Sequence, residues 1–280
     1  MAVSLPRSAT RSVASRTERR SSGPSHPARP SGIELLYGRN AVREALRARR
    51  RHLKRLLVAD GVQQSGPILE LENLADEAEI EVAYGDRRVL DEMTGGVNHQ
   101  GVAVEAGPYP YVELDEMLGL AATRGEPPLL LLLDHLQDPQ NVGTLLRTAD
   151  VVGVHGVILP GRRSAAVTPA VVNASAGAVE HLRIGNVSNL AQTMEELKAQ
   201  GVWVVGLEDD ERAQEYDRVD LAMPVALVVG AEGPGLARLV RERCDLLIKL
   251  PMAGHVASLN AATAGSIALY HLWRIRSKTS

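Results

Sequence analysis

The sequence predicts an α/β protein whose larger, C-terminal part is built on a mostly parallel sheet. From residue 129 onward, apolar runs of strand length alternate with stretches in which apolar residues recur at helical spacing. Continuous apolar strands that alternate with helices are typical of a parallel sheet covered on both faces. Ahead of this region, a shorter alternation of helix and strand patterns predicts a small separate α/β domain.

The 280 residues divide into four regions. At roughly 150 residues per domain, the length suggests about two domains. We expect a basic tail over 1–32, a small α/β domain over 33–107, a linker over 108–127 and the larger domain over 128–280. The stretch from Gly107 to Pro128 contains four prolines, with a weak helical pattern over 114–121.

The elements of the small domain follow from apolar spacing. Ala41, Val42, Ala45 and Leu46 lie on one face of a helix over 40–49. The same reasoning predicts further helices and strands in the following order: a strand over 55–59, a helix over 67–78, a strand over 81–84, a helix over 87–93 and a strand over 101–105.

The larger domain is expected to contain five strands and four helices. Val142, Leu145, Leu146 and Ala149 show the i, i+3, i+4, i+7 spacing of a buried helix face. Parallel sheets bind ligands at the carboxyl ends of their strands, so the loops after the strands are the candidate sites. The predicted strands are 129–133, 155–159, 202–206, 225–230 and 245–250, and the other predicted helices are 190–199, 236–241 and 258–276.

Composition excludes several kinds of site. Hydrophobic residues make up 45% of the chain, yet no apolar run approaches the ~18 residues that a membrane span needs. The single cysteine, Cys244, excludes an internal disulfide framework and a multi-cysteine zinc site, and we expect it to be a partly buried apolar side chain. Eight scattered histidines lack metal-ligand spacing, so we predict no metal. Neither a Gly-x-Gly-x-x-Gly nor a P-loop motif is found.

Charge is distributed unevenly along the chain. Residues 1–30 carry six arginines and one acid, a net charge of +5, which leaves −8 for the rest. Too little apolar surface is available in this tail to offset chain entropy, so we expect disorder. A basic RNA-seeking tail is the favoured interpretation, and an organellar transit peptide is the alternative. We therefore expect a cytoplasmic protein, with an organellar one as the second possibility.

A second basic segment lies in the small domain. Eight cationic residues fall within seventeen positions, from Arg39 to Arg55, and Glu44 is the only acid among them. Such a cluster is typical of a surface that contacts RNA phosphates. The alternative interpretation is a solvated helix face without a ligand.

Three loops that follow predicted strands carry candidate residues. The first contains Asn141, an ordinary helix cap by residue type, and Arg147, which could point into solvent or reach an anion at the helix N-terminus. The second, Gly230 to Leu236, has three glycines in six residues, which suits a tight turn or a backbone approach to a ligand. The third runs from Leu250 to Asn260. There Ser258 is the expected helix cap and Asn260 an ordinary polar side chain.

Together these segments resemble the SpoU branch of the SPOUT methyltransferases, the TrmH family. The matching motifs are Asn141-x-Gly143-x-x-x-Arg147, Gly230-x-Glu232-Gly233-x-Gly235 and Pro251-Met252-x-Gly254-x-Val256-x-Ser258-Leu259-Asn260. Residues 36–42 and 99–102 look like the substrate-binding domain of RlmB-type 23S rRNA guanosine 2'-O-methyltransferases. The resemblance covers about residues 34–275, and Ala257 departs from the family pattern.

The resemblance implies a SPOUT fold, in which the C-terminal segment of the parallel sheet domain forms a trefoil knot. It implies S-adenosylmethionine as cofactor, RNA as substrate and a homodimer that packs through the long C-terminal helix. It also assigns three groups of residues: Arg147, Asn141 and Glu232 to catalysis; Gly206, Gly230, Leu250, Met252, Leu259 and Asn260 to the cofactor; Arg39, Arg43, Arg47, Arg50 and Arg51 to RNA.

The leading functional hypothesis is S-adenosylmethionine-dependent 2'-O-ribose methylation of RNA, at a guanosine of 23S rRNA. A tRNA methyltransferase or a resistance-type rRNA methyltransferase is the alternative within the same class. A non-catalytic RNA-binding ribosome-assembly factor is the alternative from another class. The presence of Asn141, Arg147 and Glu232 argues against that last possibility.

Overall fold

The computed structural model describes residues 32–63, 66–161, 166–256 and 258–277. The predicted disordered tail therefore lies outside the described residues, apart from Gly32. Among the described residues, no helix combines the length and the apolar character needed to cross a membrane. None of the described His, Cys, Asp and Glu residues form a group of three or more suited to holding a metal ion.

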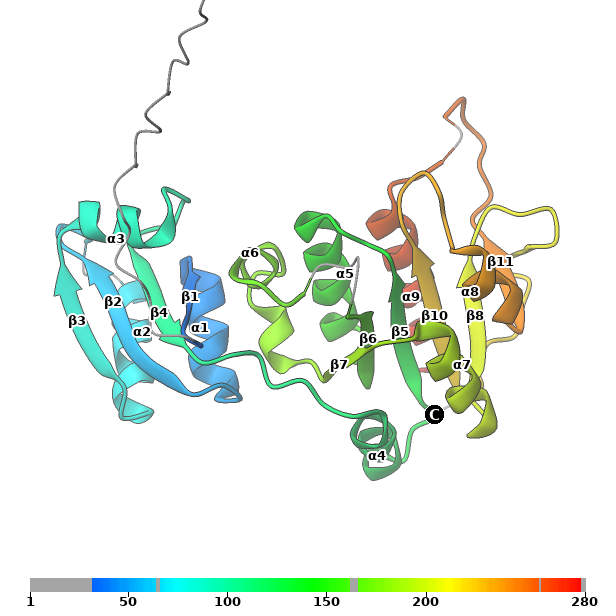
Figure 1. Ribbon diagram of the computed structural model, residues 1–280, viewed down its shortest axis with the longest axis horizontal. Coiled ribbons are helices and arrows are strands. Elements are labelled where there is room, and N and C mark those ends of the chain that lie inside the picture. Colours follow the sequence, from blue (N-terminus) through cyan, green and yellow to red (C-terminus); the bar gives the residue numbers. More distant parts are fainter. Residues whose placement is uncertain (1–31, 64–65, 162–165, 257, 278–280) are drawn as a thin grey trace, which may run out of the picture. The chain divides into compact units, whose positions relative to one another are not determined.

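The small domain is a four-stranded sheet of order β1-β4-β2-β3 with helices on both faces (Figure 1). Strand β4 is antiparallel to β1 and β2, and β2 is parallel to β3. Leu36, Leu56 and Val104 face the first two helices, whereas Leu35 and Ala103 face the third. The elements are β1 (Glu34–Tyr37), α1 (Arg39–Ala48), β2 (Leu53–Ala59), α2 (Gly66–Glu77), β3 (Glu81–Gly85), α3 (Arg87–Thr94) and β4 (Val102–Ala106).

The predicted linker contains a helix, α4 (Leu114–Arg124), that packs on the larger domain. Met117 of this helix is fully buried and belongs to the same apolar cluster as Leu130 and Ile158. Gly156 makes this packing possible, because a Cβ there would lie 2.3 Å from the Met117 sulfur. The expected helix is therefore present, but it forms part of a core and is not a free connection.

The larger domain is a parallel seven-stranded sheet of order β7-β6-β5-β10-β8-β11-β9. Its central strands β5 and β10 are buried along their whole length, as their continuous apolar sequences predict. The strands are β5 (Leu129–Asp134), β6 (Gly156–Pro160), β7 (Ile184–Val187), β8 (Trp203–Leu207), β9 (Gln214–Glu215), β10 (Val225–Gly230) and β11 (Leu246–Lys249).

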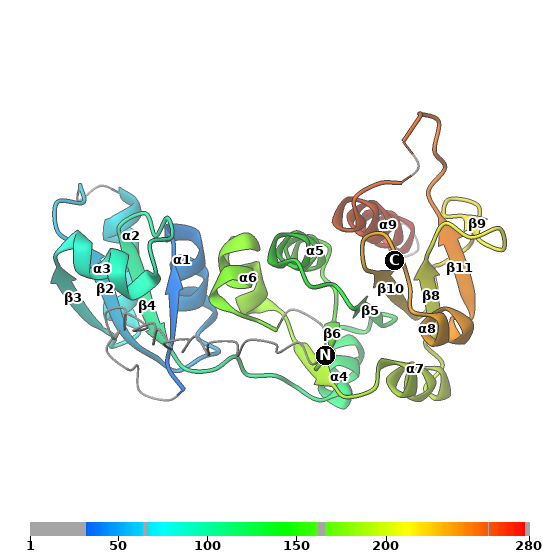
Figure 2. The same ribbon diagram turned by 45° about the horizontal axis from the view of Figure 1, so that its top comes forward.

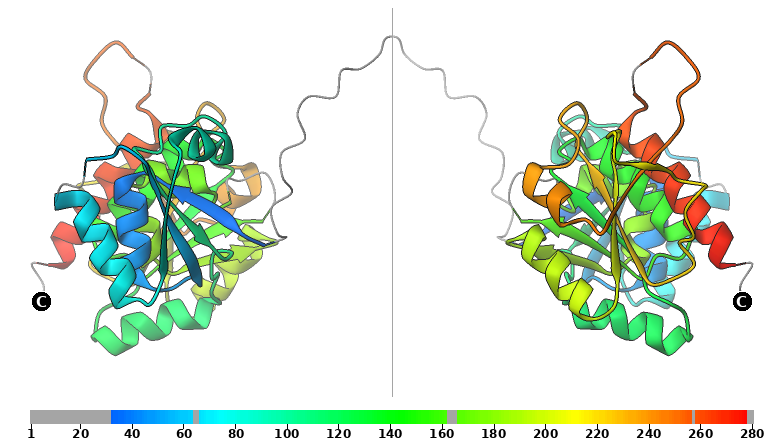
Figure 3. Two further views of the ribbon diagram at one scale, coloured as in Figure 1. Left: turned by 90° about the vertical axis from the view of Figure 1, so that its left-hand side faces the viewer. Right: turned by 90° about the vertical axis from the view of Figure 1, so that its right-hand side faces the viewer.

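Helices cover both faces of this sheet. On one face α5 (Pro139–Val151) and α9 (Ala261–Arg276) pack on Leu131 and Leu133. On the other face α4, α7 (Leu190–Ala199) and α8 (Arg238–Arg243) pack on Leu130 and Leu132. The right-hand view of Figure 3 shows α9 and α7 on opposite sides of the strands.

The predicted fold class, an α/β protein with a parallel sheet domain preceded by a small α/β domain, is confirmed. The trefoil knot stays a prediction. The sequence patterns missed five short elements, which have too few residues for a clear periodicity. These are β1, β7, β9, α6 (Pro169–Ala174) and the 3₁₀ helix η1 (Ala178–His181).

Candidate active site

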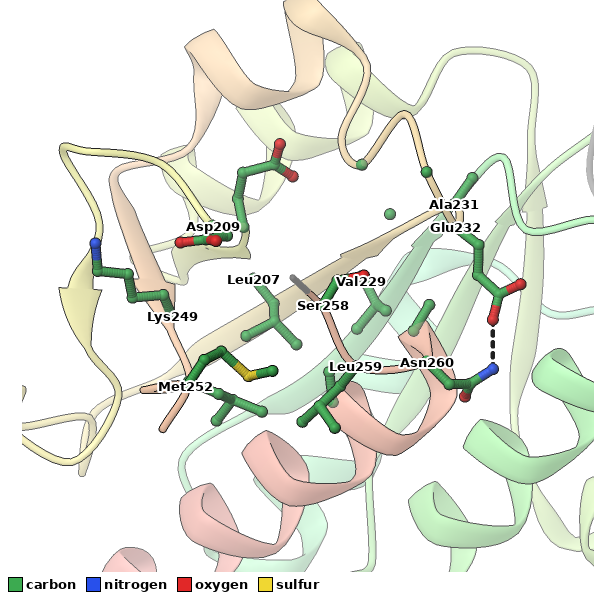
Figure 4. A pocket seen from close by; sticks show the side chains of 17 residues that line it. Leu207, Asp209, Val229, Ala231, Glu232, Lys249, Met252, Ser258, Leu259 and Asn260 are labelled. Carbon is green, nitrogen blue, oxygen red and sulfur yellow. Dashed lines mark hydrogen bonds between the residues drawn. The ribbon is translucent and has the colours of Figure 1, made fainter. Parts of the chain in front are cut away.

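The candidate active site is a cavity of about 530 Å³ at the carboxyl ends of β8, β10 and β11, closed on one side by the start of α9. Figure 4 shows apolar side chains in its middle, including Leu207, Val229 and Leu259. Asp209 and Lys249 lie toward one end, and Glu232 and Asn260 lie at the other. The predicted cofactor residues Gly230, Leu250, Met252, Leu259 and Asn260 all line this cavity.

Gly206 is not among the residues that line the cavity, and its assignment to the cofactor stays a prediction. It lies within β8, where a Cβ would come within 2.8 Å of the side chains of Cys244, Leu236 and Leu247. Glycine is needed there for packing under α8, and the next residues, Leu207 and Glu208, reach the cavity instead. Burial raises the pKa of Cys244 to about 12, so its thiol stays protonated and behaves as an apolar side chain.

The loop after β10 is folded tightly back on itself. Gly233 and Gly235 have positive φ angles of 79° and 66°, and a Cβ on Gly230 would lie 2.4 Å from the carbonyl carbon of Gly235. Such close backbone contact requires glycine at these positions. Glu208, which the sequence analysis did not single out, holds the loop by accepting a 2.9 Å hydrogen bond from the Leu236 N–H.

Asn260 joins the three sequence motifs. Its Nδ2 donates a hydrogen bond of 2.9 Å to Asn141 Oδ1. The same nitrogen donates a second hydrogen bond to Glu232 Oε1, which is drawn as a dashed line in Figure 4. Its Oδ1 accepts a 3.0 Å bond from the Thr263 N–H and so caps α9. The expectation that Ser258 is the cap and Asn260 an ordinary polar side chain was therefore wrong.

Asn141 is free for this contact because another residue caps α5. Asp138 accepts hydrogen bonds from the backbone N–H groups of Gln140 and Asn141, and Pro139 occupies the first turn. The interpretation of Asn141 as a helix cap is thus excluded. Beside it, the buried Asp134 carboxylate accepts a 2.7 Å bond from the Ala237 N–H, which ties β5 to the loop after β10.

Arg147 lies apart from the Asn260 cluster. It is exposed on α5, about 9 Å along the helix axis from Asn141 at ~1.5 Å rise per residue. Among the described residues it has no hydrogen bond or ion pair. Because its charge is not neutralised there, the guanidinium is available to an anion that approaches from solvent.

The arginines of α1 that are predicted to bind RNA contact different neighbouring residues. Arg43 and Arg47 both contact Glu44 at the helix surface, at 2.9 and 3.4 Å, and Arg47 also contacts Glu70 at 2.5 Å. Arg39 donates from Nε to the Gln100 carbonyl oxygen at 3.3 Å. Surface pairs of this kind are weak and exchange readily, so these side chains can still meet a phosphate.

Arg50 and Arg51 depart from the prediction of an RNA contact. The Arg51 side chain has no exposed surface and pairs with Glu34 at 2.6 Å and Glu180 at 2.9 Å. Arg50 is half-buried and donates to the carbonyl oxygens of Leu182 and Pro110. A buried charge that is already paired cannot contact a phosphate, so Arg51 is not part of the RNA surface.

Comparison with known proteins gives the family. The model of the SpoU rRNA Methylase family matches residues 128–270, and the model of an RNA 2'-O ribose methyltransferase substrate-binding domain matches residues 35–112. The chain belongs to the SpoU rRNA methylase family. The expected class, an RNA methyltransferase that uses S-adenosylmethionine, is thereby confirmed.

Relatives cover almost the whole chain. A Bacillus subtilis protein named as a TrmH family tRNA/rRNA methyltransferase, YacO, is 43% identical over 243 residues, which is 87% of this chain and 96% of that protein. The SpoU methyltransferase AviRb of Streptomyces viridochromogenes, solved with the cofactor AdoMet, is 26% identical with a TM-score of 0.73, covering 89% of this chain and 92% of that one. An AdoMet-bound rRNA methyltransferase of Sinorhizobium meliloti is 25% identical with a TM-score of 0.70, covering 87% and 88%.

The cavity suits S-adenosylmethionine chemically. A volume near 530 Å³ lies within the usual range of ligand pockets. The apolar side chains of Leu207, Val229 and Leu259 offer surface for an adenine ring. Carboxylates and Lys249 supply acceptors and a cation for the hydroxyl, ammonium and carboxylate groups of the cofactor, and the glycine-rich loop exposes backbone groups.

The Asn260 bridge can be tested with the variant Asn260→Asp. Aspartate still caps α9, but it replaces the Nδ2 donor by a carboxylate oxygen that repels Glu232. We expect methyl transfer to fall at least about tenfold, since a loss near 1.4 kcal/mol corresponds to a factor of ten. The matched control is Asn189→Asp at the N-cap of α7, outside the cavity. Equal activity of the two variants would show that the bridge does not matter.

Proposed function

We propose that this protein transfers a methyl group from S-adenosylmethionine to the 2'-hydroxyl of a guanosine ribose in 23S rRNA. The observation that carries the proposal is the Asn260 bridge, which brings Asn141, Glu232 and α9 together at the mouth of the cavity. The preceding domain supports an RNA substrate, because it matches a substrate-binding domain of ribose methyltransferases.

The bound cofactor supplies a methyl group made electrophilic by its sulfonium. The remaining requirements fall on the protein, because a ribose hydroxyl is a poor nucleophile until its proton is removed or its negative charge stabilised. Arginine is always protonated, so Arg147 does not act as a base. Its exposed guanidinium instead binds the RNA phosphate beside the reacting ribose and stabilises the charge that develops on the 2'-oxygen.

Asn141 and Glu232 position the substrate. Both are held by the same Asn260 amide, which leaves the Asn141 Nδ2 group and the second Glu232 oxygen available to hydroxyls of the ribose. Orienting two reactants in this way contributes on the order of 7–11 kcal/mol in favourable cases. The proton leaves toward the RNA phosphate or solvent.

We further propose a homodimer, with α9 at the interface. Three apolar side chains of α9, Ile267, Tyr270 and Trp273, are 39–48% exposed, and the last two rings are in edge-on contact at 5.9 Å. Exposed apolar groups that cluster on one helix face are typical of an interface. Tyr270→Lys should shift the protein from dimer to monomer in sedimentation equilibrium. A monomeric unmodified protein would contradict this assignment.

The decisive test is transfer of labelled methyl from S-adenosylmethionine to unmodified 23S rRNA and to bulk tRNA, followed by mapping of the modified nucleotide. Label on a 2'-O-methylguanosine of 23S rRNA supports the proposal, and label on tRNA overturns the substrate. Arg147→Ala should lower the rate by roughly 10²–10³ while cofactor binding is retained. Arg238→Ala, which removes an exposed arginine of α8, is the control. Undiminished activity of Arg147→Ala would refute its role.

The RNA surface is assigned to Arg39, Arg43 and Arg47 on α1. Log affinity falls as log salt concentration rises. Each phosphate contact makes this slope steeper by about 0.9 for a duplex and by about 0.7 for a single strand. Replacing Arg39 and Arg47 by Met should therefore weaken RNA binding and flatten this slope by roughly 1.4–1.8. An unchanged slope would place the RNA surface elsewhere.

A further inference from the structure

Helix α1 of the small domain lies directly against the larger domain, beside α6 (Figure 2). Asn173 of α6 donates a 3.1 Å hydrogen bond to the Tyr37 carbonyl oxygen, and a Cβ on Gly38 would lie 2.7 Å from the same amide nitrogen. A Cβ on Gly177 would lie 2.7 Å from the Glu44 Cβ. The two domains therefore approach each other through glycines at both ends of this contact.

A buried ion cluster fastens the end of α1. Arg51 donates from Nε to Glu180 Oε2 at 3.0 Å, and its Nη1 lies 2.6 Å from Glu34 Oε2. Glu180 belongs to η1 of the larger domain and its side chain is 1% exposed, whereas Glu34 belongs to β1 of the small domain. Arg51 thus joins the first strand of one domain to a buried acid of the other.

Tyr109 adds a third attachment next to this cluster. Its hydroxyl donates to the Leu182 carbonyl oxygen at 2.6 Å, and the Arg51 guanidinium lies 4.9 Å from the centre of its ring. Apolar packing is continuous across the contact, because Leu46 of α1, Val179 of η1 and Leu145 of α5 belong to one buried cluster. These contacts leave the small domain little freedom to rotate.

The contact continues to the catalytic helix. A Cβ on Gly143 of α5 would lie 2.4 Å from the Ala174 Cβ of α6, so the two helices touch at the backbone. Arg147 follows Gly143 by about one turn on the same helix. From the arginines of α1 to Arg147, every step is therefore a close contact between packed helices.

From this path we infer that the Arg51–Glu180 ion pair, with Glu34, is a positioning device that sets the distance between the RNA surface of α1 and Arg147. The inference rests on the proposed function. When RNA is bound to α1, the fixed distance between α1 and Arg147 determines which ribose lies next to Arg147. A buried ion pair suits this task because its geometry is directional, whereas apolar packing tolerates sliding.

The test compares Arg51→Met with Arg49→Met. Both variants lose one positive charge at neighbouring positions, but Arg49 is exposed and contacts Glu77 at 3.5 Å within the small domain. We expect Arg51→Met to lower kcat/KM for RNA at least tenfold and to spread methyl label to neighbouring riboses, with cofactor affinity unchanged. The salt slope of RNA binding should stay the same, because no phosphate contact is lost. Arg49→Met should retain the target ribose, because it leaves the Arg51 ion pairs intact.

A second experiment measures the distance between the small domain and the larger domain directly. Spin labels at Leu69→Cys on α2 and Leu239→Cys on α8, both exposed positions, report the distance between the domains in a Cys244→Ala background. A narrow distance distribution is expected, and it should broaden in Arg51→Met and in Glu180→Gln. If a single variant does not fold, the apolar double variant Arg51→Met, Glu180→Met takes its place, because well-packed apolar residues often replace a buried pair without loss of stability.

An unchanged distance distribution together with an unchanged target would overturn the inference. A salt slope lowered by about one in Arg51→Met would overturn it too, because Arg51 would then be a phosphate contact. The distance measurement does not require methyl transfer. Failure of the proposed function, seen as no label from the unmodified protein, is therefore distinguishable from failure of the positioning device.

Discussion

The site depends on one side-chain amide, that of Asn260. Asn141, Glu232 and Asn260, which span 119 residues of the chain, meet at this group, and its two polar atoms are used completely. The oxygen begins α9, and the nitrogen holds Asn141 and Glu232. Because a single residue both starts a helix and joins two loops, the position of α9 and the shape of the cavity mouth are coupled.

Glycines allow α5 to pack closely against the helices on either side of it. A Cβ on Gly265 of α9 would lie 2.6 Å from the Leu145 side chain of α5, and one on Gly143 of α5 would lie 2.4 Å from the Ala174 Cβ of α6. Gly265 therefore leaves room for the Leu145 side chain, whereas Gly143 lets the backbone of α5 approach that of α6. Helix α5 is thus held on two sides, by α9 beside the cavity and by α6, which contacts the small domain.

Burial divides the basic segment after Tyr37 into an exposed part and a buried part. Arginines at the surface of α1 keep contact with water and with weakly held acids, which suits the phosphate-binding surface proposed for them. One turn later the same residue type is buried and paired. Burial raises the pKa of Glu180, and the adjacent Arg51 opposes that rise.

Sequence alone determined the fold class and most of the long helices and strands, because apolar periodicity is a local property. The loops that the family resemblance assigned to the cofactor meet at one cavity, but their role stays a prediction. It could not separate Arg51 from Arg47, since both occur in one basic run and only the fold decides which is buried. It also missed Glu208 and misjudged Ser258 and Asn260. The partners of these residues lie far away in the chain, and only tertiary packing brings them within hydrogen-bonding distance.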